Sequence, residues 1–109
     1  MILIFRYIFP YHYVGLTIWP LIILREASLR DDKVLINHER IHLRQQVELL
    51  IIPFYLIYFM EYIFGLLKYR SSILAYRNIS FEKEAYANEY DLEYLEKRNF
   101  WTFLKYYRS

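Results

Sequence analysis

The stretch of sequence that best indicates the fold and chemistry of this chain is His38-Glu39-Arg40-Ile41-His42. Residues four apart on an α-helix lie on the same face, so this spacing brings the imidazoles of His38 and His42 to one point, where they suit a tetrahedral zinc ion. Glu39 can reach water at the ion without being a ligand, which is the position of a general base in metal-assisted hydrolysis. A solvated helical stripe with a Glu39–Arg40 charge pattern is the alternative interpretation.

A catalytic zinc needs a third protein ligand and an open coordination position. The remaining histidine, His12, lies among tyrosines and strand-like residues, which favours a core or surface role. Glu48 follows His42 by six residues, but Gln45 occupies the position where that arrangement requires glycine. The acidic residues between Ser80 and Asp91 are therefore the main candidates.

Within that segment, Glu84-Ala85-Tyr86-Ala87-Asn88 resembles the third-ligand helix of the gluzincins. In that helix a small residue lies three positions after the ligand glutamate, and an aspartate lies four positions after it. The resemblance implies that Glu84 is the third ligand. It also implies that Asn88, in place of the aspartate, orients a zinc-binding histidine, with Asp91 as a substitute one turn later. Ala85 and Ala87 would let this helix approach the histidine helix closely. Glu82, Asp91 and Glu48 remain alternative ligands.

The same segment also has the pattern of an ordinary amphipathic helix. Its predicted buried stripe contains Phe81, Ala85, Leu92 and Leu95. Its predicted solvent-exposed acids are Glu82, Glu89, Glu93 and Glu96. Glu84 borders the stripe, so the two interpretations are compatible.

Length and composition predict a single domain over residues 1–109. The chain has no cysteine, so disulfides and thiolate metal ligands are excluded. Aromatic residues make up 21% of it, which argues against disorder. A net charge of +2 is too small to indicate nucleic-acid binding. The stretch from Lys97 to Arg108 has four basic residues and no acid, which suits either a solvated helix or contact with an anionic membrane.

Two apolar segments raise the question of a membrane. Residues 7–24 contain Gly15, Thr17 and Pro20 among β-branched and aromatic residues, which suits strands. We expect residues 51–67 to form a largely buried helix with Pro53 in its first turn, and a bilayer span is the alternative. No signal peptide is evident, so we expect a cytoplasmic protein, with peripheral membrane association as a second possibility.

The expected fold class is α+β, in the order of N-terminal strands, histidine helix, backing helix, glutamate helix and short C-terminal helix. Pro20 should confine its strand to an edge or a bulge. The expected strands are Met1–Phe9 and Tyr13–Leu24, and the expected helices are about 32–51, about 54–68, one opened by Ser80, and Phe100–Tyr107. The first helix should be capped by Asp31-Asp32 and should bury Ile36, Leu43, Val47 and Leu50.

This order of elements resembles the minigluzincins, minimal zincin-like domains similar to the catalytic cores of membrane gluzincin proteases. The resemblance covers most of the chain by architecture, and by motif it rests on His38, Glu39, His42 and Glu84-Ala85. It implies one zinc ion and peptide-bond hydrolysis of a peptide or protein substrate. Independently of the resemblance, an edge strand beside a zinc helix could bind an extended peptide by main-chain hydrogen bonds. Arg77 could stand for an arginine that precedes the ligand glutamate in the membrane relatives and help hold an oxyanion. A surface arginine is the alternative.

Two other functions are compatible with the sequence. The first is a zinc-binding domain without turnover, either a scaffold or a latent zymogen. In a zymogen, residues 99–109, with Trp101, Phe103 and Leu104, would cover the cleft rather than complete the core. The second is a membrane-associated helical module in which the histidine motif is incidental.

Overall fold

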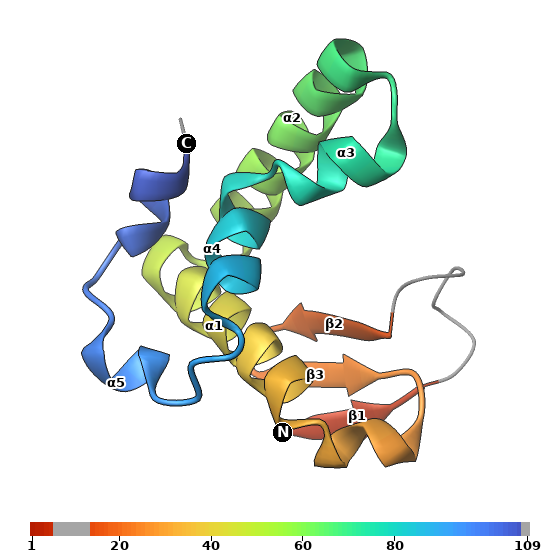
Figure 1. Cartoon of the computed structure of the whole chain (residues 1–109), viewed down its shortest axis with the longest axis vertical. Coiled ribbons are helices and arrows are strands. Elements are labelled where there is room, and N and C mark those ends of the chain that lie inside the picture. Colours follow the sequence, from red (N-terminus) through yellow and green to blue (C-terminus); the bar gives the residue numbers. More distant parts are fainter. Residues whose placement is uncertain (6–13, 108–109) are drawn as a thin grey trace.

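The structure, a computed structural model of the whole chain, describes residues 1–5 and 14–107 (Figure 1). It has the α+β fold that the sequence predicts, with three short strands followed by helices. The strands are β1 (Ile2–Ile4), β2 (Gly15–Ile18) and β3 (Leu21–Leu24). The α-helices are α1 (Lys33–Leu49), α2 (Ile51–Tyr69), α3 (Ser72–Arg77), α4 (Ser80–Asn88) and α5 (Tyr94–Lys97). Two 3-10 helices, η2 (Ala27–Asp31) and η3 (Thr102–Tyr106), complete the described elements.

The strands form one mixed sheet in the order β1-β3-β2. β1 runs parallel to β3, with Ile2 opposite Ile22, and β2 is antiparallel to β3. Pro20 lies in the turn between β2 and β3, so the single strand expected over Tyr13–Leu24 is two strands. The part before Pro20, β2, is at the edge of the sheet as expected, whereas the part after it, β3, is central. β2 is an edge strand of this sheet and lies next to α1. His12 lies outside the described residues.

Helix α1 begins where the sequence predicts, because the Asp32 carboxylate accepts a hydrogen bond from the backbone N–H of Leu35 at 3.0 Å. The predicted buried face is wrong: Val47 and Leu50 are exposed, and Ile36 and Leu43 are only partly buried. The buried residues are Asn37, His38, Glu39, Ile41, His42, Gln45 and Gln46. All but one of them are polar. Their hydrogen-bond partners lie mainly on β2, on α4 and in the segment directly after α4. No buried side-chain polar atom in the described part of the chain lacks a partner.

Helix α2 also differs from the prediction, because only Phe54 and Gly65 are fully buried along its length. α3 folds back against its second half, and the two helices project together from the rest of the molecule (Figure 1). Gly65 makes this contact possible, since a Cβ there would lie 2.9 Å from the Cα of Ala75.

Helix α4 crosses α1 and places acidic residues beside the histidines. Ala85 is fully buried and clusters with Ile41 of α1 and with Tyr94, so a small side chain does permit close packing here. A second cluster contains Phe54, Ile79, Phe81 and Phe103. Phe81 is buried as predicted, but Leu92 is 52% exposed and Glu82 only 4% exposed, opposite to the amphipathic pattern expected for them.

Candidate metal centre

The two histidines of α1 and one glutamate of α4 form a buried cluster of metal-binding side chains. The Nε2 atoms of His38 and His42 each lie 3.1 Å from the same oxygen, Oε1 of Glu82. One ligand atom from each of the three residues lies within 4.8 Å of the others. The side chains are only 5–7% exposed, so their metal-binding atoms face one another and not bulk water. Two imidazoles and a carboxylate could together hold a metal ion.

The third member of the cluster is Glu82, not Glu84, on which the sequence prediction rested. Two residues along an α-helix turn by about 200°, so Glu84 lies on nearly the opposite face of α4. Its carboxylate accepts hydrogen bonds from the Tyr94 hydroxyl at 2.6 Å and the Gln45 amide at 2.9 Å. It also forms an ion pair with Arg98. Glu84 is fully buried in this network, away from the histidine Nε2 atoms.

Arg98 also engages Glu48, the alternative ligand on α1. Its Nη2 donates to Oε1 of Glu48 at 3.0 Å and to Oε1 of Glu84 at 3.1 Å. One guanidinium thus contacts two buried carboxylates and offsets one of their two negative charges. The hydrogen bonds that Glu84 accepts from Tyr94 and Gln45 help to stabilise the remaining charge. Because Arg98 holds both, neither is available to a metal ion at the histidines.

Both histidines are oriented through their second ring nitrogen. Nδ1 of His38 lies 2.7 Å from Oε1 of Glu89, and Nδ1 of His42 lies 2.8 Å from Oε1 of Gln45. These contacts fix each ring so that its Nε2 faces Glu82, as partners of metal-binding histidines commonly do. Gln45 in turn donates to Glu84, so the Arg98 network is connected to His42.

The charges within the cluster reinforce one another. Burial by itself would lower the pKa of His42, but the charge and hydrogen bond of Glu82 outweigh it and raise that pKa to about 9. Burial would raise the pKa of Glu82, yet His42 and His38 hold it well below its usual range. The Tyr58 hydroxyl donates to the other Glu82 oxygen at 2.6 Å. With a pKa of about 9, His42 carries a proton at neutral pH, and its positive charge balances the Glu82 carboxylate. A metal ion bound at this position would balance the same carboxylate.

Glu39 is positioned beside this cluster by strand β2. The Thr17 hydroxyl donates to Oε1 of Glu39 at 2.6 Å. On the other side, a Cβ at Gly15 would come within 3.1 Å of Oε2. Glu39 is 6% exposed, and it is not part of the group of side chains that could hold the ion. It lines one cavity together with His42 and the other together with His38, so it lies next to the cluster, and its role as general base stays a prediction.

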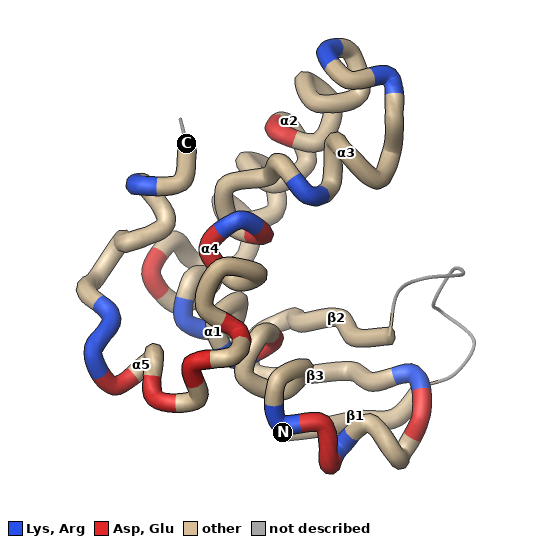
Figure 2. Tube along the Cα trace, in the orientation of Figure 1, with Lys and Arg blue, Asp and Glu red and all other residues tan. Residues whose placement is uncertain are grey.

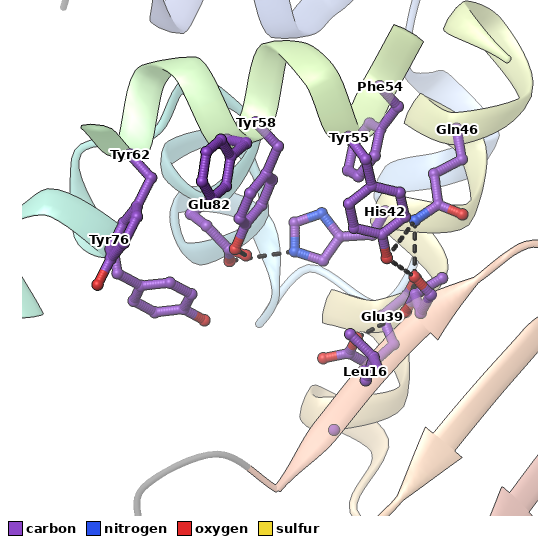
Figure 3. Close-up of a pocket in the computed structure, with 13 residues that line it drawn as sticks. Leu16, Glu39, His42, Gln46, Phe54, Tyr55, Tyr58, Tyr62, Tyr76 and Glu82 are labelled. Carbon is purple, nitrogen blue, oxygen red and sulfur yellow. Dashed lines mark hydrogen bonds and ion pairs between the residues drawn. The ribbon is translucent and has the colours of Figure 1, made fainter. Parts of the chain in front are cut away.

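A cavity of about 360 Å³ opens in front of Glu39 and His42 (Figure 3). Its wall comes from β2, α1, α2, α3 and α4, and the α2 side contributes mainly aromatic rings (Figure 3). The lining includes Gly15, Leu16, Thr17, Glu39, His42, Gln46, Phe54, Tyr55, Tyr58, Phe59, Tyr62, Tyr76 and Glu82. A second cavity, of about 610 Å³, contacts His38, Glu39 and Glu89. Space for a bound molecule thus exists on both sides of Glu39.

The residues predicted to assist the site lie in different surroundings. Asn88 donates to the backbone oxygen of Glu84 at 2.8 Å and to the Tyr106 hydroxyl at 3.1 Å, so it contacts neither histidine. Asp91 pairs with Lys97 at 2.8 Å. Glu89, not Asn88 or Asp91, is the residue that orients His38.

Arg77 lines the second cavity together with His38 and Glu39. Its guanidinium lies 3.9 Å from the centre of the Tyr86 ring, and that ring packs against His38 with centroids 4.5 Å apart. Arg77 therefore stands at the edge of the site, one ring removed from the cluster.

The C-terminal segment contributes to the core. Phe103 is 4% exposed and packs against Phe81, with ring centroids 4.9 Å apart. Within the described part of the chain, neither cavity is lined by any residue of 99–107.

The sequence named Glu82 only as an alternative ligand, and it assigned no part in the site to Glu89, Gln45, Thr17 or Tyr58. Glu82 and Glu89 are seven residues apart, or about two helical turns, and this spacing places both on the face that meets His38. Ala85 follows Glu82 by three positions, the same spacing that Ala87 has from Glu84, so spacing alone did not separate the two acids. Gln45, Thr17 and Tyr58 left no local signal, because their roles depend on contacts between distant elements.

The donor set of the cluster could hold a metal ion, which would displace the proton from His42 on binding. Two imidazoles and one carboxylate, each with a partner on its other polar atom, leave room for a further ligand from the cavity side. No protein-family model, curated protein or solved structure matches this chain.

Proposed function

We propose that this protein is a zinc-dependent peptidase, with His38, His42 and Glu82 as metal ligands and Glu39 as general base. The observation that carries the proposal is the convergence of His38 Nε2 and His42 Nε2 on one oxygen of Glu82, with the Glu39 carboxylate beside them at a cavity. Three buried ligands with an accessible fourth side are typical of catalytic zinc sites, whereas structural sites are closed by a fourth protein ligand.

The residues around the cluster have separable roles in hydrolysis. When bound, zinc would supply a Lewis acid that polarises a peptide carbonyl and makes water more acidic. Glu39 would take the proton from the attacking water and return it to the amine that leaves. Thr17 holds Oε1 of Glu39 by a hydrogen bond, so Oε2, on the Gly15 side, is the oxygen placed for this transfer.

The surroundings also favour an extended peptide as the substrate. β2 is an edge strand of the described sheet, and Gly15, Leu16 and Thr17 line the cavity. A peptide could add to this edge by main-chain hydrogen bonds and bring one carbonyl to the site. The aromatic wall from α2 would then receive an apolar side chain of that peptide.

Metal analysis and peptide hydrolysis, measured on the same preparations, test the proposal. We expect one zinc per chain, cleavage of a peptide library that stops on chelation, and recovery when zinc is returned. Glu39→Gln should keep zinc and lose cleavage, whereas His42→Ala should lose both. Zinc without cleavage in the wild-type protein would identify a non-catalytic metal-binding domain instead. Unchanged zinc content in His42→Ala would disprove the site.

A further inference from the structure

The two faces of α2 are the reverse of those expected for a surface helix in water, with polar side chains turned inward and apolar side chains turned outward. Its tyrosines and its one acid turn toward the rest of the protein and are partly buried. Large apolar side chains point outward, with Leu56, Met60, Phe64 and Leu67 exposed by 61%, 56%, 63% and 72%. A surface helix of a soluble protein presents charged and polar residues on that side. These outward side chains therefore cannot form hydrogen bonds with water.

Glu61 shows how completely charge is kept from this face. It is the only charged residue between Ile51 and Leu67. Its carboxylate accepts hydrogen bonds from the backbone N–H and the hydroxyl of Ser80, at 2.7 and 2.8 Å. The charge is thus turned inward to the start of α4 and is satisfied there, as charges within apolar surroundings must be.

We propose that the outward face of α2 is buried in the acyl chains of a lipid bilayer. α2 is long and apolar enough to cross a membrane, and only 11% of its apolar 18-residue stretch is buried within the protein. A helix of 19 residues is about 28 Å long, close to the roughly 30 Å of a hydrocarbon core. Ile73 and Leu74 of α3 are 58% and 48% exposed and extend the apolar surface.

The charge distribution favours lipid over a second protein. Lys68 and Arg70 are exposed and lie at the far tip of the α2–α3 hairpin, where they could meet phosphate groups (Figure 2). In the C-terminal segment, by contrast, Lys97 pairs with Asp91, and Arg98 is buried with Glu84 and Glu48. A protein interface carries a polar rim and about one hydrogen bond per 100–200 Å². The outward face of α2 offers neither between Ile52 and Leu67.

The cavity of the candidate metal centre adjoins this face. Phe59 of α2 lines the cavity and is also 62% exposed. With α2 in a bilayer, the cavity would open next to the lipid surface.

Vesicle flotation tests the proposal. The full-length protein, purified in mild detergent, is diluted into vesicles of phosphatidylethanolamine and phosphatidylglycerol and centrifuged through a density gradient. We expect it to float with the vesicles and to remain bound in a high-salt wash, because acyl contact is not screened by salt. The variant Leu56→Gln/Phe64→Gln/Leu67→Gln should reduce the vesicle partition coefficient by at least about tenfold.

The matched control is Leu92→Gln/Phe100→Gln/Leu104→Gln, which removes the same side-chain types from positions exposed by 52%, 70% and 57% elsewhere on the molecule. This control should float like the wild-type protein. Circular dichroism of both variants should give the wild-type spectrum, which checks that they are folded. The proposal would be overturned if the wild-type protein stayed in solution or if salt released it from the vesicles. It would also be overturned if the α2 variant floated as well as the wild-type protein. A concentration-dependent dimer that excludes vesicles would overturn it too, since α2 would then be a protein interface.

Discussion

Gly15 lies directly against the carboxylate of Glu39, so that a Cβ at this glycine would be 3.1 Å from Oε2 and 3.2 Å from the carboxyl carbon. This separation is shorter than an ordinary van der Waals contact. The edge strand can therefore lie this close to the carboxylate of the proposed general base because it carries glycine here, and a Cβ would push that carboxylate aside by a few tenths of an ångström. The positive φ angles that often explain a glycine play no part, since neither glycine of the chain has one.

Gly15→Ala should displace the Glu39 carboxylate while leaving the ligands in place. We expect zinc content to be unchanged and kcat for peptide cleavage to fall by about tenfold, because an error of 1 Å in a catalytic group is costly. Steady-state kinetics and metal analysis measure the two effects. An alanine variant with full kcat would show that the carboxylate has room to move.

Gly65→Ala makes the same change away from the site. The new methyl group would lie 2.9 Å from both the Cα and the Cβ of Ala75, so α2 and α3 must separate. We expect this overpacking to exceed the gain in helix propensity and to lower the free energy of unfolding by about 1 kcal/mol. Denaturant titration measures that loss, and kcat should stay near the wild-type value. If kcat fell as far as in Gly15→Ala, the effect at Gly15 would not be specific to Glu39.

Two glutamates of α4 should behave differently when each is changed to glutamine. Glu82→Gln should weaken zinc binding by more than about 100-fold, beyond the range for residues that only orient a ligand. Glu84→Gln should keep the zinc but lower the free energy of unfolding by about 2 kcal/mol, since a neutral amide loses the charge-assisted hydrogen bonds that the carboxylate accepts from Arg98 and Tyr94. Zinc titration and denaturant unfolding of both variants separate ligand from structural acid. Loss of zinc from Glu84→Gln alone would restore the original prediction.

Phe103→Ala tests whether the C-terminal segment stabilises the fold or blocks the site. Because Phe103 is buried against Phe81, we expect a loss of about 3 kcal/mol of folding stability and no gain in peptide cleavage. Leu104→Ala is the control, since Leu104 is 57% exposed and should change stability by less than about 0.5 kcal/mol. A rise in cleavage for Phe103→Ala, with the protein still folded, would instead support latency.

The histidine helix could be predicted because its determinants are local. The four-residue spacing of His38 and His42 places them on one face of any α-helix, and the Asp32 cap sets where that helix begins. The α+β order of elements followed from strand-like and helix-like patterns in the same way. The hydrophobic pattern of α1 misled, because buried polar side chains such as Gln45 and Gln46 replace the apolar residues that a core helix usually buries.

The sequence by itself determined that His38 and His42 would share one face of a helix, with Glu39 next to the first of them, because helical geometry depends only on residue spacing. Their burial was decided by the elements that pack on that face. The sequence did not determine which acid would join them. Glu82 and Glu84 differ by two positions, and the rotation of α4 that selects between them depends on the packing of Ala85 against Ile41 and on Arg98, which takes up Glu84. Likewise, composition alone marked α2 as apolar. Only the tertiary structure decided that its tyrosines and Glu61 face the protein and its aliphatic side chains face outward, because the facing of a helix is set by the elements that pack against it.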